Sequence, residues 1–174
     1  NTSMCGRYRI TEEISNLLRA FDHELTPPAG FTVRWNIAPT QQAPVVLQEG
    51  HAVRLEMMRW GLVPSWAKDT KEASRCINAR SETAAEKPSF RSAFRHRRCL
   101  VPAHGYYEWT GAPGTKQPWH FGLKGGALMC FAGLWESWTP PEHGGTPSLP
   151  APLHTYTILT TRPNELAARW HDRM

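Results

Sequence analysis

The chain has 174 residues, enough for a domain with its own hydrophobic core. Its formal net charge of +5, from 20 lysines and arginines against 15 acidic residues, is compatible with a polyanionic partner. The four cysteines are widely spaced and form no Cys-x-x-Cys pair, which argues against a zinc ribbon: Cys5, Cys76, Cys99 and Cys130. No signal peptide, membrane-spanning run or lipidation motif stands out, so a cytoplasmic protein with reduced thiols is expected.

The first half of the chain is predicted to consist of a helix followed by short strands. Apolar residues recur at helical spacing between Thr11 and Phe21, and β-branched or alternating runs predict the strands. The expected elements are a helix at 11–21, a strand at 31–37, a hairpin of 44–48 and 52–58, a loop at 60–66, and short helical turns at 81–85 and 88–95.

The second half is predicted to be richer still in strands. The expected elements are strands at 99–102 and 105–109, a turn at 111–114, a hairpin of 118–123 and 127–135, an exposed loop at 139–152, a strand at 155–161, and a last helical turn capped by Asn164. Many short strands with few helices indicate an α+β domain dominated by antiparallel β-sheet, without an internal boundary.

Cys5 directly follows Met4, so initiation at Met4 and removal of that methionine would leave Cys5 with a free α-amine beside its thiol. An α-amine has a pKa of about 7.7–8.0, against about 10.4 for lysine, so part of it is unprotonated near neutral pH. The amine can attack an aldehyde, and the thiol can then close a five-membered thiazolidine ring. The plainer alternative is a small buried cysteine in a first strand.

Further polar groups stand where a purely structural pattern does not call for them. Asn78 lies at the end of a predicted strand, Glu108 lies between aromatic residues, and His171 lies in a polar stretch near the C-terminus. Burial among aromatics raises the pKa of a carboxyl group and suits it to acid–base work. A helix cap, a surface ion pair and a surface histidine are the structural alternatives. A basic run, Arg91, Arg95, His96, Arg97 and Arg98, is either a polyanion site or a solvated face.

Several motifs in this order closely resemble the SOS response-associated peptidase (SRAP) family, which shields abasic sites in single-stranded DNA. The resemblance extends from Met4 to the last residue. Its motifs are Met4-Cys5-Gly6-Arg7-Tyr8, Trp35-Asn36-Ile37-Ala38-Pro39, Arg59-Trp60-Gly61-Leu62-Val63-Pro64-Ser65-Trp66, Ile77-Asn78-Ala79-Arg80-Ser81-Glu82-Thr83, Cys99-Leu100-Val101-Pro102-Ala103, Gly105-Tyr106-Tyr107-Glu108-Trp109 and His171-Asp172-Arg173-Met174.

The resemblance implies a single compact, barrel-like domain that cross-links the ring-opened aldehyde of an abasic site through its N-terminal cysteine. Cys5 would then be the nucleophile, Asn78 would position its amine and the sugar, and Glu108 would assist ring opening and proton transfer. His171 would contact the sugar hydroxyl or shuttle protons. No cofactor and no metal are implied.

The family resemblance also implies a site for single-stranded DNA. Arg7 and Arg80 would hold phosphates beside the lesion, and Trp60 and Trp66 would stack on or wedge beside bases. The basic run would contribute further phosphate contacts from Arg91, Arg95 and Arg98. The expected partner is single-stranded DNA that contains abasic sites, bound by a monomer near the nucleoid and not at a membrane.

Two departures from the family pattern affect these expectations. Asn1-Thr2-Ser3 precede Met4, so Cys5 is not terminal as written, and residues 1–4 are interpreted as a leader or an expression remnant. The chain stops at Met174, where family members usually continue, so it is interpreted as truncated or as a short variant, and His171 is expected at a frayed end. His104 stands where the family often has an acidic residue and is assigned no role.

Two other classes of protein remain open. A cysteine peptidase or autoprotease would use the Cys5 thiolate with His171 and Glu108 as partners. A non-covalent binder of single-stranded nucleic acid would need only the arginines and tryptophans. A protein that traps abasic sites requires a free α-amine on Cys5. The peptidase requires only a thiolate, and the non-covalent binder requires neither.

Overall fold

The computed structural model describes residues 6–12, 19, 28–141 and 152–174. Strands dominate these residues and the helices among them are few and short, which confirms the predicted α+β class with mostly antiparallel sheet. The predicted helix at 11–21 and most of the predicted loop at 139–152 lie outside the described residues. Cys5, the predicted nucleophile, also lies outside them.

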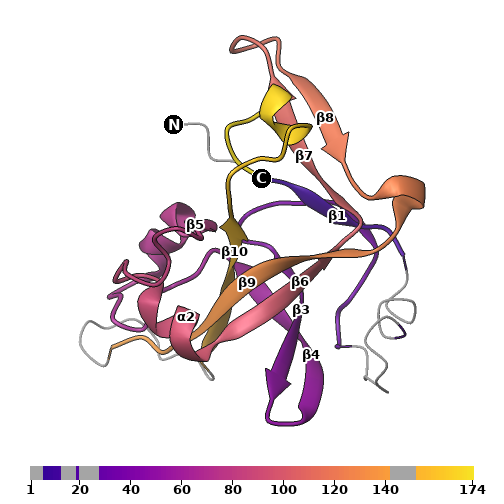
Figure 1. Ribbon diagram of the computed structural model, residues 1–174. Helices are drawn as coiled ribbons and strands as arrows, with labels where there is room; N and C mark the ends of the chain where they lie inside the picture. The colour runs from indigo at the N-terminus through magenta and orange to yellow at the C-terminus, as the bar shows by residue number, and fades with distance from the viewer. Residues whose placement is uncertain (1–5, 13–18, 20–27, 142–151) are drawn as a thin grey trace.

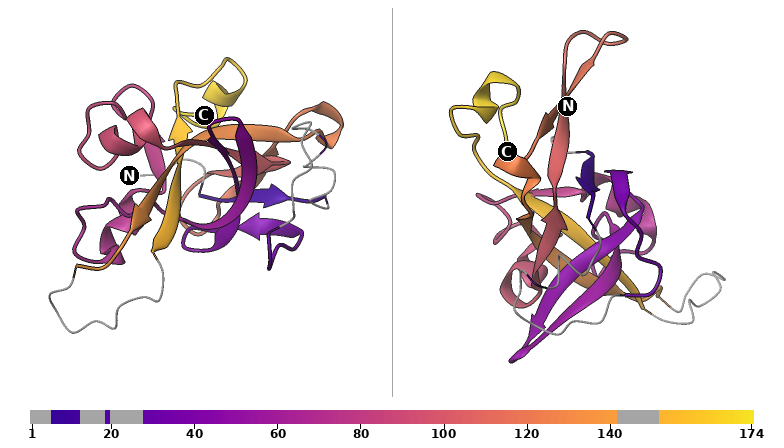
Figure 2. Two further views of the ribbon diagram at one scale, coloured as in Figure 1. Left: turned by 90° about the horizontal axis from the view of Figure 1, so that it is seen from below. Right: turned by 90° about the vertical axis from the view of Figure 1, so that its right-hand side faces the viewer.

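Five strands close into a barrel (Figures 1 and 2). The predicted hairpin forms the first two strands, residues 42–49 and 52–60. The last strand, residues 153–160, pairs antiparallel along one edge with the strand before it, residues 129–138. Along its other edge the last strand pairs parallel with the hairpin, where Tyr156 lies beside Trp60, and this pairing closes the ring. In barrel order the strands are β4 (Ala52–Trp60), β3 (Gln42–Glu49), β6 (Arg98–Ala103), β9 (Met129–Trp138) and β10 (Leu153–Thr160).

A short strand, β5 (Asn78–Arg80), extends the barrel at the C-terminal end of β10. The same edge of β10 pairs first with β4, at Thr155 and Tyr156, and then with β5, from Ile158 to Thr160. The two partners thus share one edge in succession. Because β5 pairs at this end, its residues and the segment that follows β10 lie close together.

A second sheet has the strand order β2-β1-β7-β8 and projects from the barrel (Figure 2). One predicted hairpin is wrong: β8 pairs with β7 through the turn at 111–114, and β9 pairs with β6 and β10 instead. The 3-10 turn η2 (Lys124–Gly126) carries the chain from one sheet to the other, with Gly125 at φ 76°. The strands are β1 (Tyr8–Ile10), β2 (Arg34–Ile37), β7 (Gly105–Thr110) and β8 (Gln117–Phe121).

The turn between β6 and β7 is built around His104 and Gly105. His104 is fully buried, and its Nδ1 accepts a hydrogen bond from the Thr11 backbone N–H at 3.2 Å. A Cβ added to Gly105 would lie 2.1 Å from the His120 Nε2, and the residue has φ +141°, so only glycine fits. The close approach of β8 to the start of β7 therefore requires glycine at position 105. His104 has a structural role, because its buried ring holds the backbone of Thr11.

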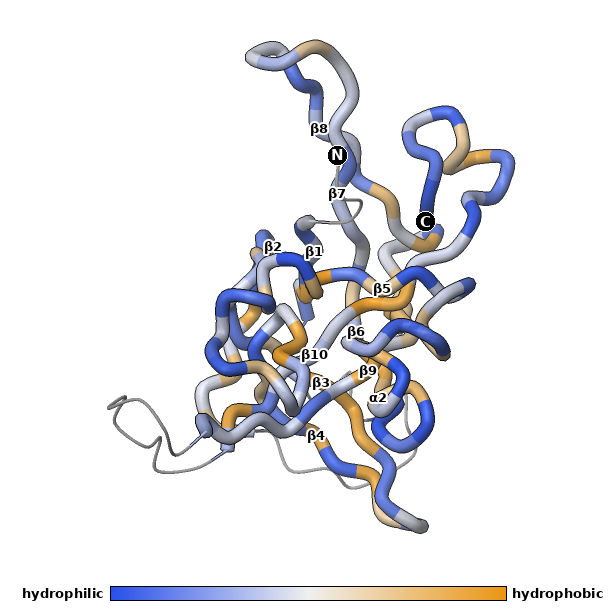
Figure 3. Tube along the Cα trace, turned by 90° about the vertical axis from the view of Figure 1, so that its left-hand side faces the viewer, coloured by the Kyte–Doolittle hydropathy of each residue, from blue (hydrophilic) through white to orange (hydrophobic). Residues whose placement is uncertain are grey.

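Aromatic side chains join β1, a strand of the second sheet, to the barrel. The Trp60 ring packs edge-on against Tyr8 with centroids 5.2 Å apart and lies nearly parallel to Tyr156 at 6.3 Å. The hydroxyls of Tyr8 and Tyr156 are 2.6 Å apart. Trp60 is the last residue of β4 and is 0% exposed, so its predicted place in a loop is wrong. Figure 3 shows hydrophobic segments along β3, β9 and β10, the strands that surround this core.

The helix α2 (Arg91–His96) covers one side of the barrel, whereas the turn η3 (Ala167–Arg169) lies beside the second sheet (Figure 1). The predicted helix near 88–95 is present as α2, and Phe90 and Ala93 pack with Leu134 of β9. The predicted cap is also present, because Asn164 Oδ1 accepts the Ala167 N–H at 2.8 Å. The helical segments are η1 (Thr70–Arg75), α2 (Arg91–His96) and η3 (Ala167–Arg169).

Candidate functional site

The N-terminal segment runs along β7. Tyr8 lies opposite Tyr106, and the backbone oxygen of Arg7 accepts the Tyr107 N–H at 2.9 Å. The described chain therefore enters the fold beside Glu108, the residue after Tyr107. The Arg7 side chain donates to Asn36 Oδ1 at 3.2 Å, which holds its guanidinium over the neighbouring strand β2.

Glu108 is buried, with 6% of its surface exposed, which rules out the alternative of a surface ion pair. Its direct partner on β8 is Trp119, so the two side chains share one face of the sheet. Trp119 donates to Thr110 Oγ1 at 2.9 Å and packs edge-on against Trp170 at 5.6 Å. Glu108 thus lies on the face that the C-terminal segment covers.

Asn78 begins β5, opposite Ile158 of β10. The residue before it, Ile77, accepts a hydrogen bond from Trp60 Nε1 at 2.9 Å. Because Trp60 also packs against Tyr8 of β1, the same buried ring contacts both β1 and the residue before β5. Asn78 is half-buried and is held at this junction.

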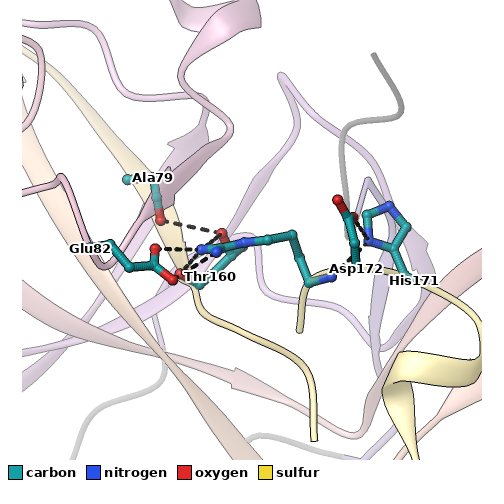
Figure 4. Close-up of polar contacts among 6 residues, drawn as sticks. Ala79, Glu82, Thr160, His171 and Asp172 are labelled. Carbon is teal, nitrogen blue, oxygen red and sulfur yellow. Dashed lines mark hydrogen bonds and ion pairs between the residues drawn. The ribbon is translucent and has the colours of Figure 1, made fainter.

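His171 follows η3 in a segment that hydrogen bonds join to the end of β10, where the sequence led us to expect a frayed end. Its side chain is 11% exposed, and its Nδ1 accepts the Arg173 N–H at 3.1 Å. Met174 and Thr161 exchange backbone hydrogen bonds of 2.7 and 3.0 Å, which fastens the segment to the end of β10. Arg173 forms a two-pronged ion pair with Glu82, in the turn after β5 (Figure 4).

These contacts connect the predicted polar residues around one end of β10. Asn78 begins the strand that pairs there, and His171 belongs to the segment anchored at Thr160 and Thr161. Glu108 lies opposite Trp119 in the sheet. The Trp119 ring contacts the ring of Trp170, which precedes His171 in the sequence. Asn78 and His171 therefore lie on segments that the Glu82–Arg173 ion pair joins, and Glu108 lies opposite the tryptophan against which Trp170 packs.

The predicted arginines fall into two groups. Arg80, Arg91, Arg95 and Arg98 are exposed and available to an anion. Arg97, the other arginine of the basic run, instead forms an ion pair with the buried Glu136 of β9, at 2.8 Å. The basic run is thus interrupted by one arginine that serves the fold.

The two predicted stacking tryptophans also differ. Trp60 has no exposed surface and offers no face to a base. Trp66 is 59% exposed, and its Nε1 donates to the Pro88 oxygen at 3.4 Å, just before α2. Trp66 therefore remains a candidate for stacking, next to the helix that carries Arg91 and Arg95.

The three cysteines among the described residues all have thiol pKa values above the ordinary value, although Cys130 is exposed. Burial raises the pKa of the Cys99 thiol to about 12. Burial is also the main cause that raises the pKa of Cys76, and desolvation raises the pKa of Cys130. None of these three cysteines is therefore favoured as a thiolate nucleophile.

Glu82 and Arg173 each belong to one of the family motifs, but the sequence alone indicated no role for either residue. The ion pair with Arg173 lowers the pKa of the Glu82 carboxyl group to about 2. Opposite charges in two short polar motifs were the available signal. Separation by 91 positions hid the pair, because only the fold brings them together.

Among the described residues, no group of three or more histidine, cysteine, aspartate or glutamate side chains is arranged to hold a metal ion. The same part of the chain contains no helix long and apolar enough to cross a membrane.

The family model for SOS response associated peptidases (SRAP) matches residues 4–174. The chain belongs to the SRAP family. It is 43% identical over 173 residues to abasic site processing protein YoqW of Bacillus subtilis (strain 168), covering 98% of this chain and 74% of that protein. It is 30% identical over 211 residues to abasic site processing protein HMCES of Gallus gallus, covering 98% of this chain and 61% of that protein.

A solved structure of a protein from Bacteroides thetaiotaomicron has the same fold, with a TM-score of 0.82 at 22% identity. The match covers 98% of this chain and 75% of that one. At this level of identity the likeness supports the fold alone.

Proposed function

We propose that this chain processes abasic sites by binding single-stranded DNA and capturing the lesion covalently through Cys5. The observation that carries the proposal is the pairing of the N-terminal segment with β7, where the Arg7 oxygen accepts the Tyr107 N–H at 2.9 Å, directly beside the buried Glu108. The relatives named abasic site processing proteins support the choice of lesion.

The reaction joins an aldehyde, an amine and a thiol, and it releases one water. The α-amine of Cys5 attacks C1′ of the ring-opened deoxyribose, and the carbinolamine loses water to give an imine. The Cys5 thiol then adds to the imine carbon, and its proton passes to the nitrogen as the thiazolidine ring closes.

The polar residues around the end of β10 serve the proton movements of these steps. Glu108 takes up and returns the protons of ring opening and dehydration, for which a buried carboxyl group is suited. Asn78 positions the amine and the sugar, and His171 presents its Nε2 to the sugar hydroxyl. These roles follow the family motifs in which the residues stand.

Binding of the strand relies on phosphate contacts and base stacking. Arg80, Arg91, Arg95 and Arg98 are exposed, and Trp66 lies beside the start of α2. Exposed arginines together with an accessible ring suit a flexible, single-stranded backbone. Arg7 assists at the lesion, from its position over Asn36.

The decisive experiment mixes protein that begins at Cys5 with single-stranded DNA carrying one abasic site, and then resolves the products on a denaturing gel. A heat-stable adduct is expected, and it should be absent with protein that begins at Asn1, whose Cys5 nitrogen is an amide. The intact mass of the longer form is recorded first, to exclude self-cleavage. Equal trapping by both forms, with residues 1–4 still attached, contradicts the mechanism.

The family description also contains the word peptidase, which favours a second candidate function, removal of the segment before Cys5. That activity needs the thiolate but no free amine. Loss of residues 1–4 from the longer form during incubation, detected by mass and abolished by Cys5→Ala, is the expected sign. A stable mass over the same period rejects the peptidase.

A further inference from the structure

Arg173 joins two parts of the site that are distant in the sequence. Its Nη1 and Nη2 donate to the two carboxylate oxygens of Glu82 at 2.7 and 2.8 Å, and Nη2 also donates to the Thr160 backbone oxygen at 2.6 Å. Glu82 lies in the turn after β5, and Thr160 ends β10. A planar guanidinium held by a carboxylate and a carbonyl has little freedom to rotate.

The same residue determines the surroundings of the His171 ring. The Arg173 N–H donates to His171 Nδ1 at 3.1 Å, a contact that requires the Nε2–H tautomer of the neutral ring. Asp172 Oδ1 lies 2.9 Å from the same Nδ1 and is the partner for the imidazolium form (Figure 4). The turn that Arg173 anchors thus supplies one partner for each protonation state of the ring.

We infer that the Glu82–Arg173 ion pair is a clamp that positions His171 for abasic-site capture and fixes its Nε2–H tautomer. This inference rests on the proposed function, in which the His171 Nε2 must face the sugar hydroxyl. Arg173 and Glu82 are positioning residues: they act through His171 and do not touch the sugar.

The alternative for Arg173 is direct contact with a DNA phosphate. The structure argues against it, because both terminal nitrogens already have oxygen partners and the side chain is only 13% exposed. The exposed Arg80 is better placed for that task. A clamp affects the rate of the chemical step, whereas a phosphate contact affects the affinity for DNA, so the two roles separate experimentally.

The kinetic test compares Arg173→Lys, Glu82→Gln and the double variant, all in protein that begins at Cys5. Lysine keeps the charge but loses the fork, and glutamine keeps the shape but loses the charge. We expect each single variant to lower the trapping rate at saturating abasic DNA about tenfold, with the Kd for DNA unchanged within about twofold. The double variant should be no slower than either single variant, because both break the same contact. Glu82→Asp, which preserves the charge, should recover part of the rate.

The matched control is Glu49→Gln, which breaks the 2.8 Å ion pair between Arg54 and Glu49 at the β3–β4 hairpin, away from the site. It should trap at the wild-type rate. Wild-type rates in both clamp variants, additive losses in the double variant, or a weaker Kd with a normal rate at saturation each overturn the inference.

A second measurement does not depend on trapping. Long-range ¹H–¹⁵N spectra of the histidine rings report which nitrogen of His171 carries the proton. We expect the Nε2–H form in the wild-type protein and a mixture of tautomers in Glu82→Gln. An unchanged tautomer in that variant contradicts the clamp. If wild-type protein traps no DNA while the spectra respond as expected, the clamp stands and the proposed function fails.

Discussion

The barrel and the rim that carries the candidate site are stabilised in different ways. The barrel is closed by continuous strand pairing and filled with apolar and aromatic side chains such as Trp60, Tyr156 and Val101, all with no exposed surface. The rim is assembled from short segments: the three-residue strands β1 and β5 and the turn after β10. Apart from the buried side chains of Tyr8, Ile10 and Ala79, these segments are held in place by hydrogen bonds and by the Glu82–Arg173 ion pair.

The difference indicates that stability and chemistry are carried by different residues. Loss of a barrel side chain should unfold the protein, whereas loss of a rim residue should leave a folded protein with altered reactivity. Tyr8 and Trp60 are where the two regions meet, because their rings pack together while Tyr8 belongs to β1 and Trp60 to β4. Four substitutions test this division.

Trp60→Ala should have the largest effect on stability. The substitution removes a fully buried ring and the hydrogen bond from its Nε1 to Ile77, so we expect a loss of about 3–5 kcal/mol in the free energy of unfolding. Urea denaturation followed by tryptophan fluorescence measures the loss. Trp66→Ala, at an exposed ring, should change that free energy by less than about 0.5 kcal/mol. Similar losses for both variants refute the assignment of Trp60 to the core.

Glu108→Gln should slow adduct formation by about 100-fold while the protein stays folded, because glutamine keeps the shape of the side chain but does not accept protons. Single-turnover trapping across a range of pH gives the rate, and circular dichroism verifies folding. A rate that equals wild type at every pH removes Glu108 from the mechanism.

Arg80→Glu should weaken the binding of single-stranded DNA at low salt. If Arg80 neutralises one phosphate, the slope of log K against log salt should become shallower by about 0.7. Fluorescence anisotropy at four salt concentrations measures this slope. Arg97→Gln serves as a contrast, since Arg97 is paired with Glu136 and should affect stability more than the slope. An unchanged slope for Arg80→Glu excludes a phosphate contact there.

Cys130→Ser should have the smallest effect, with trapping rates within about twofold of wild type. Desolvation raises the pKa of the Cys130 thiol, so little thiolate forms at neutral pH. Cys5→Ser in the same assay keeps the amine but prevents ring closure, and only a reversible imine should form. A large loss of trapping in Cys130→Ser contradicts the assignment of the chemistry to Cys5.

Local patterns predicted the short-range elements of the fold well. The β3–β4 hairpin, the strands β6, β7 and β10, and the Asn164 cap all occupy their predicted positions, because turn residues and alternation act over a few residues. The partner of β8 was wrong. A glycine turn stood at each end of that strand, at 111–114 and at 124–126, and the sequence carries no local signal that selects between them.

The site shows the same limit. The motifs singled out Asn78, Glu108 and His171, and of the two alternatives left open for Glu108, burial and a surface ion pair, the structure shows burial. The long-range partners were not predictable: the Arg173–Glu82 ion pair spans 91 positions, and the Arg97–Glu136 pair spans 39. Trp60 was placed in a loop because the glycine and proline after it dominate the local pattern, although the ring itself fills the core.

The position of β10 has a consequence for how the protein is made. This strand pairs with β9, β4 and β5, so the ring cannot close until residues 153–160 have left the ribosome. Until then, the hydrophobic edges of β4 and β9 lack their partner, and β5 has no strand to pair with. Synthesis at about 5–20 residues per second makes this an interval of several seconds, in which those unpaired edges are open to pairing with another chain.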